Sequence, residues 1–387
     1  MISDLDRVNP PHLYLEITPD LRDEAWRQSR LLATPHSQWQ GYLNYLCTYT
    51  VLPWIRAEQE AGAEPTVPRA ALPSFWELVN GSAIALRPHR LVLMPTEAVD
   101  IDELRVPQEW IDIPEWRGDY YWGVQVEPDA GWVRVFGFTT HHQIKQAGQY
   151  DWRDRTYAVA DLDLMADLSV LWTARQLQVA TVTQAECAPL PRLKPSQARQ
   201  LIQRLGDAAL PQPRLSVPFT QWGALVAHGG WRQQLAEQRW GLTAQRQVPD
   251  WLAAGIRQLA TQVGWQQVNW QTAPALGRGE ATETPTAAFS RQLSIEQVPY
   301  ELRVVPLDVV NNRWRFELSC LIPGRPIPAG FRLYLLTEDL QPFEGNAEVA
   351  EQPVDQLLIE VALEPDEGIV WGTSPAPDQY DVEILRF

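Results

Sequence analysis

Cysteine is scarce in this sequence, and its scarcity excludes two kinds of stabilisation. The 387 residues contain only Cys47, Cys187 and Cys320, which are odd in number and far apart. A disulfide framework needs paired cysteines, and a zinc site of the CxxC type needs closely spaced ones. We therefore expect reduced, mostly buried thiols.

Lysine is rarer still, since Lys145 and Lys194 are the only lysines among 32 basic residues. Schiff-base chemistry and the P-loop each need a lysine in a particular context, which neither of these has. The GxSxG, GxGxxG, Walker, HExxH and EF-hand motifs are also missing from the sequence. The sequence thus predicts no catalytic residue, no metal ligand and no cofactor.

Long apolar runs are absent as well. The most apolar stretch, Tyr42–Ile55, includes Asn44 and Pro53 and is shorter than the roughly 18 residues that a membrane span needs. The first residues, MISDLDRVNPP, lack the basic start and apolar stretch of a signal peptide. We expect a soluble, cytoplasmic protein that makes no contact with a membrane.

Tryptophan and acidic residues, by contrast, are plentiful. The chain has 18 tryptophans, a net charge of −16 and a hydrophobic content of 45%, which is enough for a sizeable core. Its length predicts two or three domains. Most of the tryptophans are expected in the core, because each brings a large apolar surface and one N–H group.

Residues 1–190 predict an α+β domain, with N-terminal helices packed on a small, mostly antiparallel sheet. Strand-like alternation and a Pro-Asp-Ala-Gly turn predict a hairpin of Asp119–Val126 and Trp132–Phe138. A long helix is expected from near Ser37, with a kink or restart at Pro53. Asp161 is expected to cap a further helix that ends near Leu177.

The rest of the chain changes character twice. Residues 191–271 have helical periodicity and are rich in glutamine and arginine, which predicts a basic helical segment. Residues 272–290 are small and rich in proline and threonine, which is typical of a linker. Residues 291–387 alternate short strand-like runs with turns, which predicts a β-sandwich-like domain.

Charge divides along nearly the same boundaries. The net charge is −11 over residues 1–190, +7 over residues 191–278 and −12 over residues 279–387. The basic segment is therefore a candidate interaction surface, for a protein or for the phosphates and bases of a nucleic acid. Pairing with the acidic neighbours in the same chain is the alternative, and the overall negative charge disfavours nucleic acid. The candidate surface residues are Arg192, Lys194, Arg199, Arg204, Arg214, Arg232 and Arg239.

A second polar cluster lies within residues 139–155. Paired histidines with nearby acids can supply a general base or metal ligands, so a hydrolase or metal enzyme is one interpretation. Adjacent histidines point in different directions on a helix or a strand, however, and a threonine before them is a natural helix cap. A structural role is therefore favoured over chemistry for His141, His142, Asp151 and Asp154.

The run His228-Gly-Gly-Trp231 is similar to the oxyanion-hole loops of esterases. Those loops act beside a GxSxG nucleophile, which this chain lacks. The glycines are better explained by a joint between two helices.

Several stretches carry a resemblance to a known family. They are residues 132–145 (WVRVFGFTTHHQIK) and 167–177 (DLSVLWTARQL), supported by residues 90–97 (RLVLMPTE), Trp222 with Gly230-Trp231, and residues 327–333 (IPAGFRL). On these grounds the sequence resembles the DUF1822 family of cyanobacterial proteins. The resemblance covers most of the chain and points towards signalling-related protein partners. It implies no reaction, so no catalytic residue is carried over.

Together these observations predict a multidomain, non-enzymatic protein-interaction or regulatory protein. Contact with nucleic acid through the basic segment is one alternative, and an enzyme centred on residues 139–155 is the other.

Overall fold

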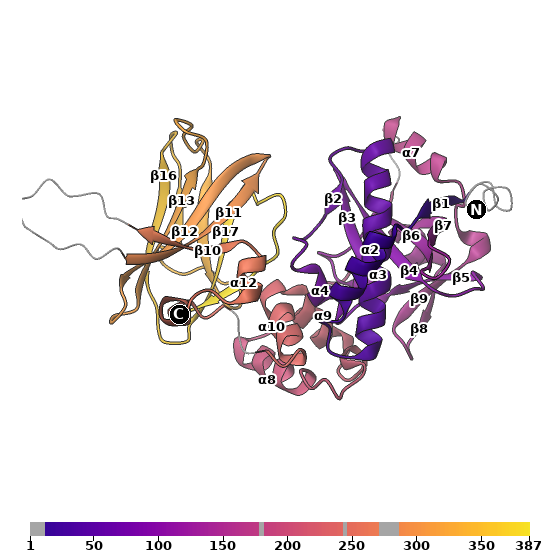
Figure 1. The fold of residues 1–387 in the computed structure, drawn as a ribbon, viewed down its shortest axis with the longest axis horizontal. Coiled ribbons are helices and arrows are strands. Elements are labelled where there is room, and N and C mark those ends of the chain that lie inside the picture. The colour runs from indigo at the N-terminus through magenta and orange to yellow at the C-terminus, as the bar shows by residue number, and fades with distance from the viewer. Residues whose placement is uncertain (1–11, 178–181, 243–245, 271–285) are drawn as a thin grey trace, which may run out of the picture. The chain divides into compact units, whose positions relative to one another are not determined.

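The chain folds into two compact units, Met1–Gly241 and Leu242–Phe387, which we describe separately. The structure is a computed structural model, and it describes residues 12–177, 182–242, 246–270 and 286–387. Both helices and several sheets are present, as the predicted α+β class requires (Figure 1).

A six-stranded sheet forms the centre of the first unit. Its strands follow the order β1-β7-β6-β4-β3-β2, and every pair is antiparallel except β4 with β6. This confirms the mostly antiparallel sheet and the hairpin of β6 and β7. The strands are β1 (Leu13–Glu16), β2 (Glu64–Pro65), β3 (Ser82–Leu86), β4 (His89–Thr96), β6 (Tyr120–Glu127) and β7 (Trp132–Thr140).

A smaller three-stranded sheet, ordered β5-β9-β8, lies in the same unit. It consists of β5 (Glu103–Pro107), β8 (Gln149–Asp151) and β9 (Thr156–Ala160). The short helices of this part of the unit are α4 (Leu72–Trp76), α5 (Gln108–Asp112), α6 (His141–Ala147) and α7 (Leu168–Gln176).

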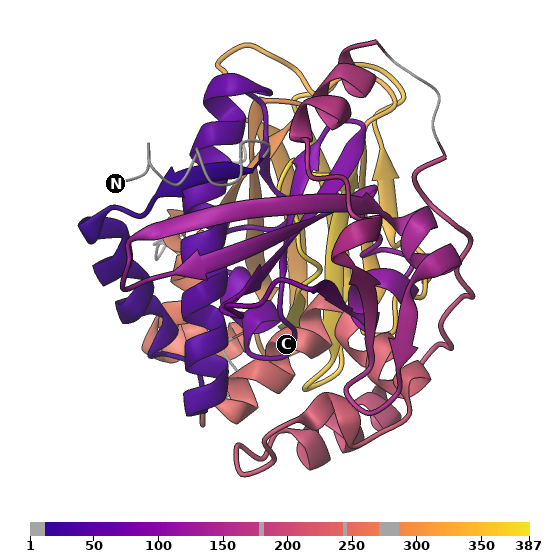
Figure 2. The same ribbon diagram turned by 90° about the vertical axis from the view of Figure 1, so that its right-hand side faces the viewer.

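The helices α2 (Pro19–Ser29) and α3 (Pro35–Glu58) pack side by side, and α3 runs across the six-stranded sheet (Figures 1 and 2). Thr34 caps α3 by accepting a hydrogen bond from the Ser37 amide at 3.1 Å. The predicted restart at Pro53 is wrong, because α3 continues as one helix to Glu58 with Pro53 on its exposed side.

The predicted cap at Asp161 is also wrong. Residues 161–163 form only a 3-10 turn, since Met165 then donates to the Phe138 carbonyl at 2.9 Å and leaves the helical path. The helix α7 begins later, where Asp167 accepts from the Ser169 amide at 2.9 Å.

The predicted helical segment 191–271 divides between the two units. The first unit holds α8 (Pro195–Leu205), the 3-10 turn η2 (Pro213–Leu215), α9 (Phe219–Ala227) and α10 (Gly229–Arg239). The second unit holds α11 (Val248–Ala254), α12 (Gln258–Gln262) and the strand β10 (Trp265–Trp270). Gly255, with a φ of 83°, ends α11.

The second unit is built from two antiparallel sheets that share one core. The first sheet has the order β10-β11-β12-β13-β16 and the second the order β15-β14-β17-β18. Trp251, Trp265, Trp314 and Trp371 are all buried in that core. The remaining strands are β11 (Thr286–Ile295), β12 (Val298–Asp308), β13 (Arg313–Cys320), β14 (Arg332–Thr337), β15 (Ala347–Val349), β16 (Gln356–Ala362), β17 (Gly368–Ser374) and β18 (Ile384–Arg386).

The predicted linker 272–290 is only partly covered by the structure. Residues 272–285 lie outside the described residues, and residues 286–290 belong to β11. They are strand because they pair with β10, where Phe289 stands opposite Gln267.

Candidate functional site

A polar cleft of about 200 Å³ opens in the first unit between the start of α3, the segment after α4, the strands β5 and β9, and the turn η2. Two buried carboxylates are central to this region, Glu77 on the cleft wall and Glu109 behind Arg214. The polar side chains that line the cleft are those of His36, Ser37, Gln40, Glu77, Asn80, Arg105, Asp154, Thr156, Gln212 and Arg214.

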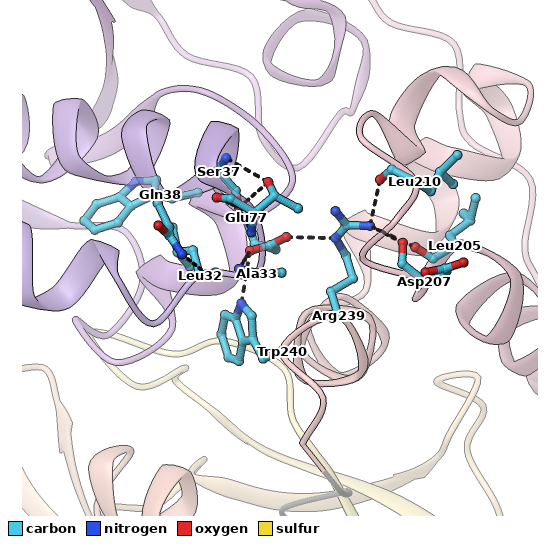
Figure 3. Close-up of polar contacts among 12 residues, drawn as sticks. Leu32, Ala33, Ser37, Gln38, Glu77, Leu205, Asp207, Leu210, Arg239 and Trp240 are labelled. Carbon is cyan, nitrogen blue, oxygen red and sulfur yellow. Dashed lines mark hydrogen bonds and ion pairs between the residues drawn. The ribbon is translucent and has the colours of Figure 1, made fainter.

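Glu77 caps the end of α4 and is fully enclosed by donors from its own chain (Figure 3). One carboxylate oxygen accepts from the Ala33 amide at 2.9 Å and from the Trp240 indole at 3.1 Å. The other accepts from Nε of Arg239 at 2.8 Å.

Arg239 is as deeply buried as its partner. Its Nη1 atom donates to the carbonyls of Leu205, Asp207 and Leu210 at 3.0–3.2 Å (Figure 3). The guanidinium therefore joins the end of α8 and the loop after it to the carboxylate of Glu77, directly after α4.

Glu109 holds a second buried pair. Arg214 donates to both of its oxygens, from Nε at 2.9 Å and from Nη2 at 2.6 Å, and the Trp222 indole donates at 2.6 Å. Burial lowers the pKa of Arg214, but the Glu109 carboxylate outweighs this and raises it above its ordinary value. Such bidentate, charge-assisted pairs are among the stronger polar contacts in proteins.

These two pairs hold the helices α8–α10 and the turn η2 against the rest of the first unit. Each carboxylate accepts three hydrogen bonds from side chains or amides of the chain itself. A general base must be able to accept a proton from a substrate within hydrogen-bond reach. The arrangement is therefore suited to fixing the fold rather than to proton transfer.

The predicted polar cluster at residues 139–155 does not come together as one site. Asp151 accepts from the Arg153 amide at 2.9 Å, and Asp154 accepts from the Thr156 hydroxyl at 2.7 Å, within the β8–β9 turn. His141 lies instead at the start of α6, buried, and His142 donates its amide to the Thr183 carbonyl at 2.9 Å. The predicted threonine cap is present, since Thr140 accepts from the Gln143 amide.

His141 pairs with a residue that sequence reasoning did not connect to it, Cys187. Its Nε2 atom lies 2.8 Å from the Ile111 carbonyl, and its Nδ1 atom accepts from the Ala185 amide at 2.9 Å. These partners place the proton on Nε2, the nitrogen that lies 3.6 Å from the Cys187 sulfur.

That tautomer is the wrong one for activating a thiol. Burial lowers the pKa of His141, and burial also raises the pKa of the Cys187 thiol, so both groups favour their neutral forms. The thiol itself donates to the Ile111 carbonyl at 3.1 Å. A catalytic Cys–His pair needs the opposite arrangement, a thiolate beside a basic nitrogen.

His228 has the structural role that the sequence favoured. Its Nδ1 atom accepts from the Trp231 amide at 3.3 Å and so caps α10, and its ring stacks on Trp231 with centroids 4.2 Å apart.

The predicted basic surface is only partly exposed. Arg214, Arg232 and Arg239 point into the first unit, because buried carboxylates, carbonyls and an aromatic ring provide partners for them there. The Arg232 guanidinium, for example, lies 3.8 Å from the centre of the Phe75 ring. The exposed members all lie on or just before α8, and they are Arg192, Lys194, Arg199 and Arg204.

A third buried charge cluster lies in the second unit and has no sequence signal, since its members are up to 137 residues apart. Glu383 accepts from Nε of Arg246 at 2.9 Å, from the Trp371 indole at 2.8 Å and from Arg291. Burial raises the pKa of Glu383, but Arg291 and Arg246 outweigh it and hold the pKa below its ordinary value.

Two further features bear on function. Within the described ranges, no group of three or more His, Cys, Asp or Glu side chains is arranged to hold a metal ion. No helix in the described part of the chain is long and apolar enough to cross a membrane.

Comparison with known proteins places the whole arrangement in a family. No curated protein and no solved structure matches the chain. The model of one family, described as a protein of unknown function (DUF1822), matches residues 15–386, which include both units. The chain therefore belongs to the DUF1822 family.

Proposed function

We propose that this chain is a cytoplasmic, non-enzymatic interaction or regulatory protein that binds another protein through the tip of the β8–β9 hairpin. The observation that carries this proposal is Trp152, whose side chain is 74% exposed at that tip. Tryptophan is enriched among the residues that dominate protein–protein binding, because it offers a large, rigid contact area.

Polar contacts stabilise the tip on both sides of Trp152. Asp151 accepts from the Arg153 amide, and Asp154 accepts from the Thr156 amide at 3.2 Å and from its hydroxyl. Arg105 adds a bond from Nη1 to Asp154 at 3.2 Å. A rigid anchor loses little conformational entropy on binding, which favours affinity.

The buried pair of Glu109 and Arg214 supports the same turn from below. Arg214 donates from Nη1 to the Asp154 carbonyl at 2.6 Å and from Nη2 to the Arg155 carbonyl at 3.1 Å. This largely buried ion pair thus positions the turn that carries Trp152, the most exposed tryptophan among those whose burial the structure describes, which supports a binding role for the tip.

Site-specific photocrosslinking tests the proposal in the cells that naturally make the protein. A benzoylphenylalanine at position 152 is expected to give one discrete adduct with a partner, while the same group at Leu162, which is 96% exposed elsewhere, gives none. Excess unlabelled wild-type protein should compete the adduct away, and the Trp152→Ala variant should not. Absence of an adduct specific to position 152 contradicts the proposal.

Nucleic acid is a weaker candidate. Nucleic-acid binding is favoured by the exposed basic side chains around α8, which form a short cationic stretch. They are Arg192, Lys194, Arg199 and Arg204. Of the seven predicted contacts, however, Arg232 and Arg239 are buried and Arg214 is largely enclosed, and the net charge of −16 repels a polyanion. Salt-dependent binding that is lost on replacing these four residues would support this alternative.

A further inference from the structure

A second aromatic surface lies on the first unit, where α2 meets the first turns of α3. Trp26 on α2 is 47% exposed, and Trp39 on α3 is 38% exposed. Both pack on the ring of Tyr42: Trp26 meets it edge-on at a centroid distance of 5.5 Å, and Trp39 lies tilted at 5.4 Å. We call these three residues the aromatic surface.

Acidic side chains surround the aromatic surface. Glu97 accepts a hydrogen bond from the Trp39 indole at 2.8 Å. Asp23 and Asp129 lie close enough to raise the pKa of Tyr42, in addition to the larger effect of burial, and Arg22 opposes them. These three carboxylates are exposed and outnumber the Arg22 guanidinium around Tyr42, while Arg27 and Arg30 add positive charge at the end of α2.

Two other tyrosine rings on α3 already contact a cation from this chain. One turn further along α3, the Arg69 guanidinium lies 5.4 Å from the centre of the Tyr45 ring and 4.8 Å from that of Tyr49. In the described part of the chain, no arginine or lysine stands over the rings of the aromatic surface in this way. Arg27, the neighbour of Trp26, is paired with Glu24.

Aromatic faces attract cations through their negative quadrupole, and nearby carboxylates add charge attraction. We propose that the aromatic surface binds a partner-protein segment that presents arginine side chains, with the guanidinium groups over Trp26 and Trp39 and paired to Glu97. This goes beyond the proposed function, because it names the chemistry of a partner at a surface distinct from the β8–β9 tip.

The probe for this proposal is an amidated (Gly-Arg)4 peptide, titrated into the full chain at about 50 mM salt, where screening is weak. We expect the Trp26→Ala/Trp39→Ala variant to bind it at least about fivefold more weakly than wild type, and Glu97→Gln about threefold more weakly. The matched control, Trp152→Ala, removes an exposed tryptophan elsewhere and should bind within about twofold of wild type. A peptide with citrulline in place of arginine, which lacks the charge, should bind at least tenfold more weakly, roughly the loss of a charge-assisted contact.

Equal binding by wild type and the double variant would overturn the proposal, because it would show that the negative charge of the chain alone holds the peptide. The proposal would also be overturned if Trp152→Ala weakened peptide binding as much as the double variant does. If circular dichroism shows that the double variant does not fold, Trp26→Ala alone is used instead. It is expected to bind the peptide about threefold more weakly than wild type. Failure of the crosslink at position 152 leaves this peptide measurement unaffected, so the two proposals fail separately.

Discussion

Arg214 and Glu109 form a bidentate buried pair whose guanidinium also donates to the two backbone carbonyls of the β8–β9 turn. One side chain thus links the protein interior to the turn that exposes Trp152. The pair has little solvent around it, since the Glu109 side chain is fully buried.

Replacing Arg214 by alanine is expected to destabilise the first unit by about 3–5 kcal/mol, because the buried Glu109 carboxylate loses its guanidinium partner. Urea unfolding followed by tryptophan fluorescence measures this loss. Arg204→Ala, which removes an exposed arginine 10 positions earlier, should change stability little. Similar losses in the two variants would show that Arg214 does not brace the unit.

The pair of Glu77 and Arg239 should behave as one unit in a double-mutant cycle. Arg239→Ala alone is expected to cost about 3–5 kcal/mol, since it strands a buried carboxylate. The double variant with Glu77→Gln should cost clearly less than the sum of the single variants, with a coupling of about 1–3 kcal/mol. Additive losses in urea unfolding would contradict direct pairing.

Acid should destabilise the second unit partly through Glu383. Its pKa in the folded state lies below the ordinary value of 4.5, so the unfolded state binds its proton more readily. The stability it contributes is complete above pH 4.5 and falls as the pH drops through the folded-state pKa. Unfolding free energies measured from pH 6 to about pH 3 should therefore fall less steeply in Glu383→Gln than in wild type. If the unfolding free energy of Glu383→Gln falls with pH as steeply as that of wild type, the Glu383 carboxylate is not held by Arg246 and Arg291.

Cys187 should be a slow nucleophile. Burial raises its pKa, so the thiolate fraction at pH 7 is smaller than that of an ordinary cysteine. Iodoacetamide labelling, followed by mass spectrometry of the Cys187 peptide, should be slower in the folded chain than after unfolding. Labelling that is faster in the folded chain and slows in His141→Ala would instead indicate an activated pair.

Sequence reasoning reached the fold class because the patterns behind it are local. Alternation and a Pro-Asp-Ala-Gly turn identify the β6–β7 hairpin, and the turns between residues 291 and 387 identify the antiparallel strands. Errors arose where a distant contact decided the outcome. Met165 leaves the helical path because it pairs with Phe138, and residues 286–290 extend because they pair with β10.

The site was harder to predict for the same reason. Nothing near Arg214 or Arg239 in the sequence indicates the carboxylates with which they pair. Glu109 lies 105 residues from Arg214, and Glu77 lies 162 residues from Arg239. The charge division did indicate intramolecular pairing as an alternative, and these two arginines follow it. The exposure of Trp152 had only one signal, its position among charged residues in the run Asp151-Trp-Arg-Asp154.

The most direct test of the account is the affinity between the purified chain and the partner captured at position 152. Trp152→Ala is expected to weaken binding at least about 30-fold, the effect of removing a dominant interface residue worth roughly 2 kcal/mol. Leu162→Ala, at a more exposed position outside the hairpin, should leave the affinity unchanged. Equal affinity of Trp152→Ala and wild type would contradict the claim that this chain acts through the β8–β9 tip.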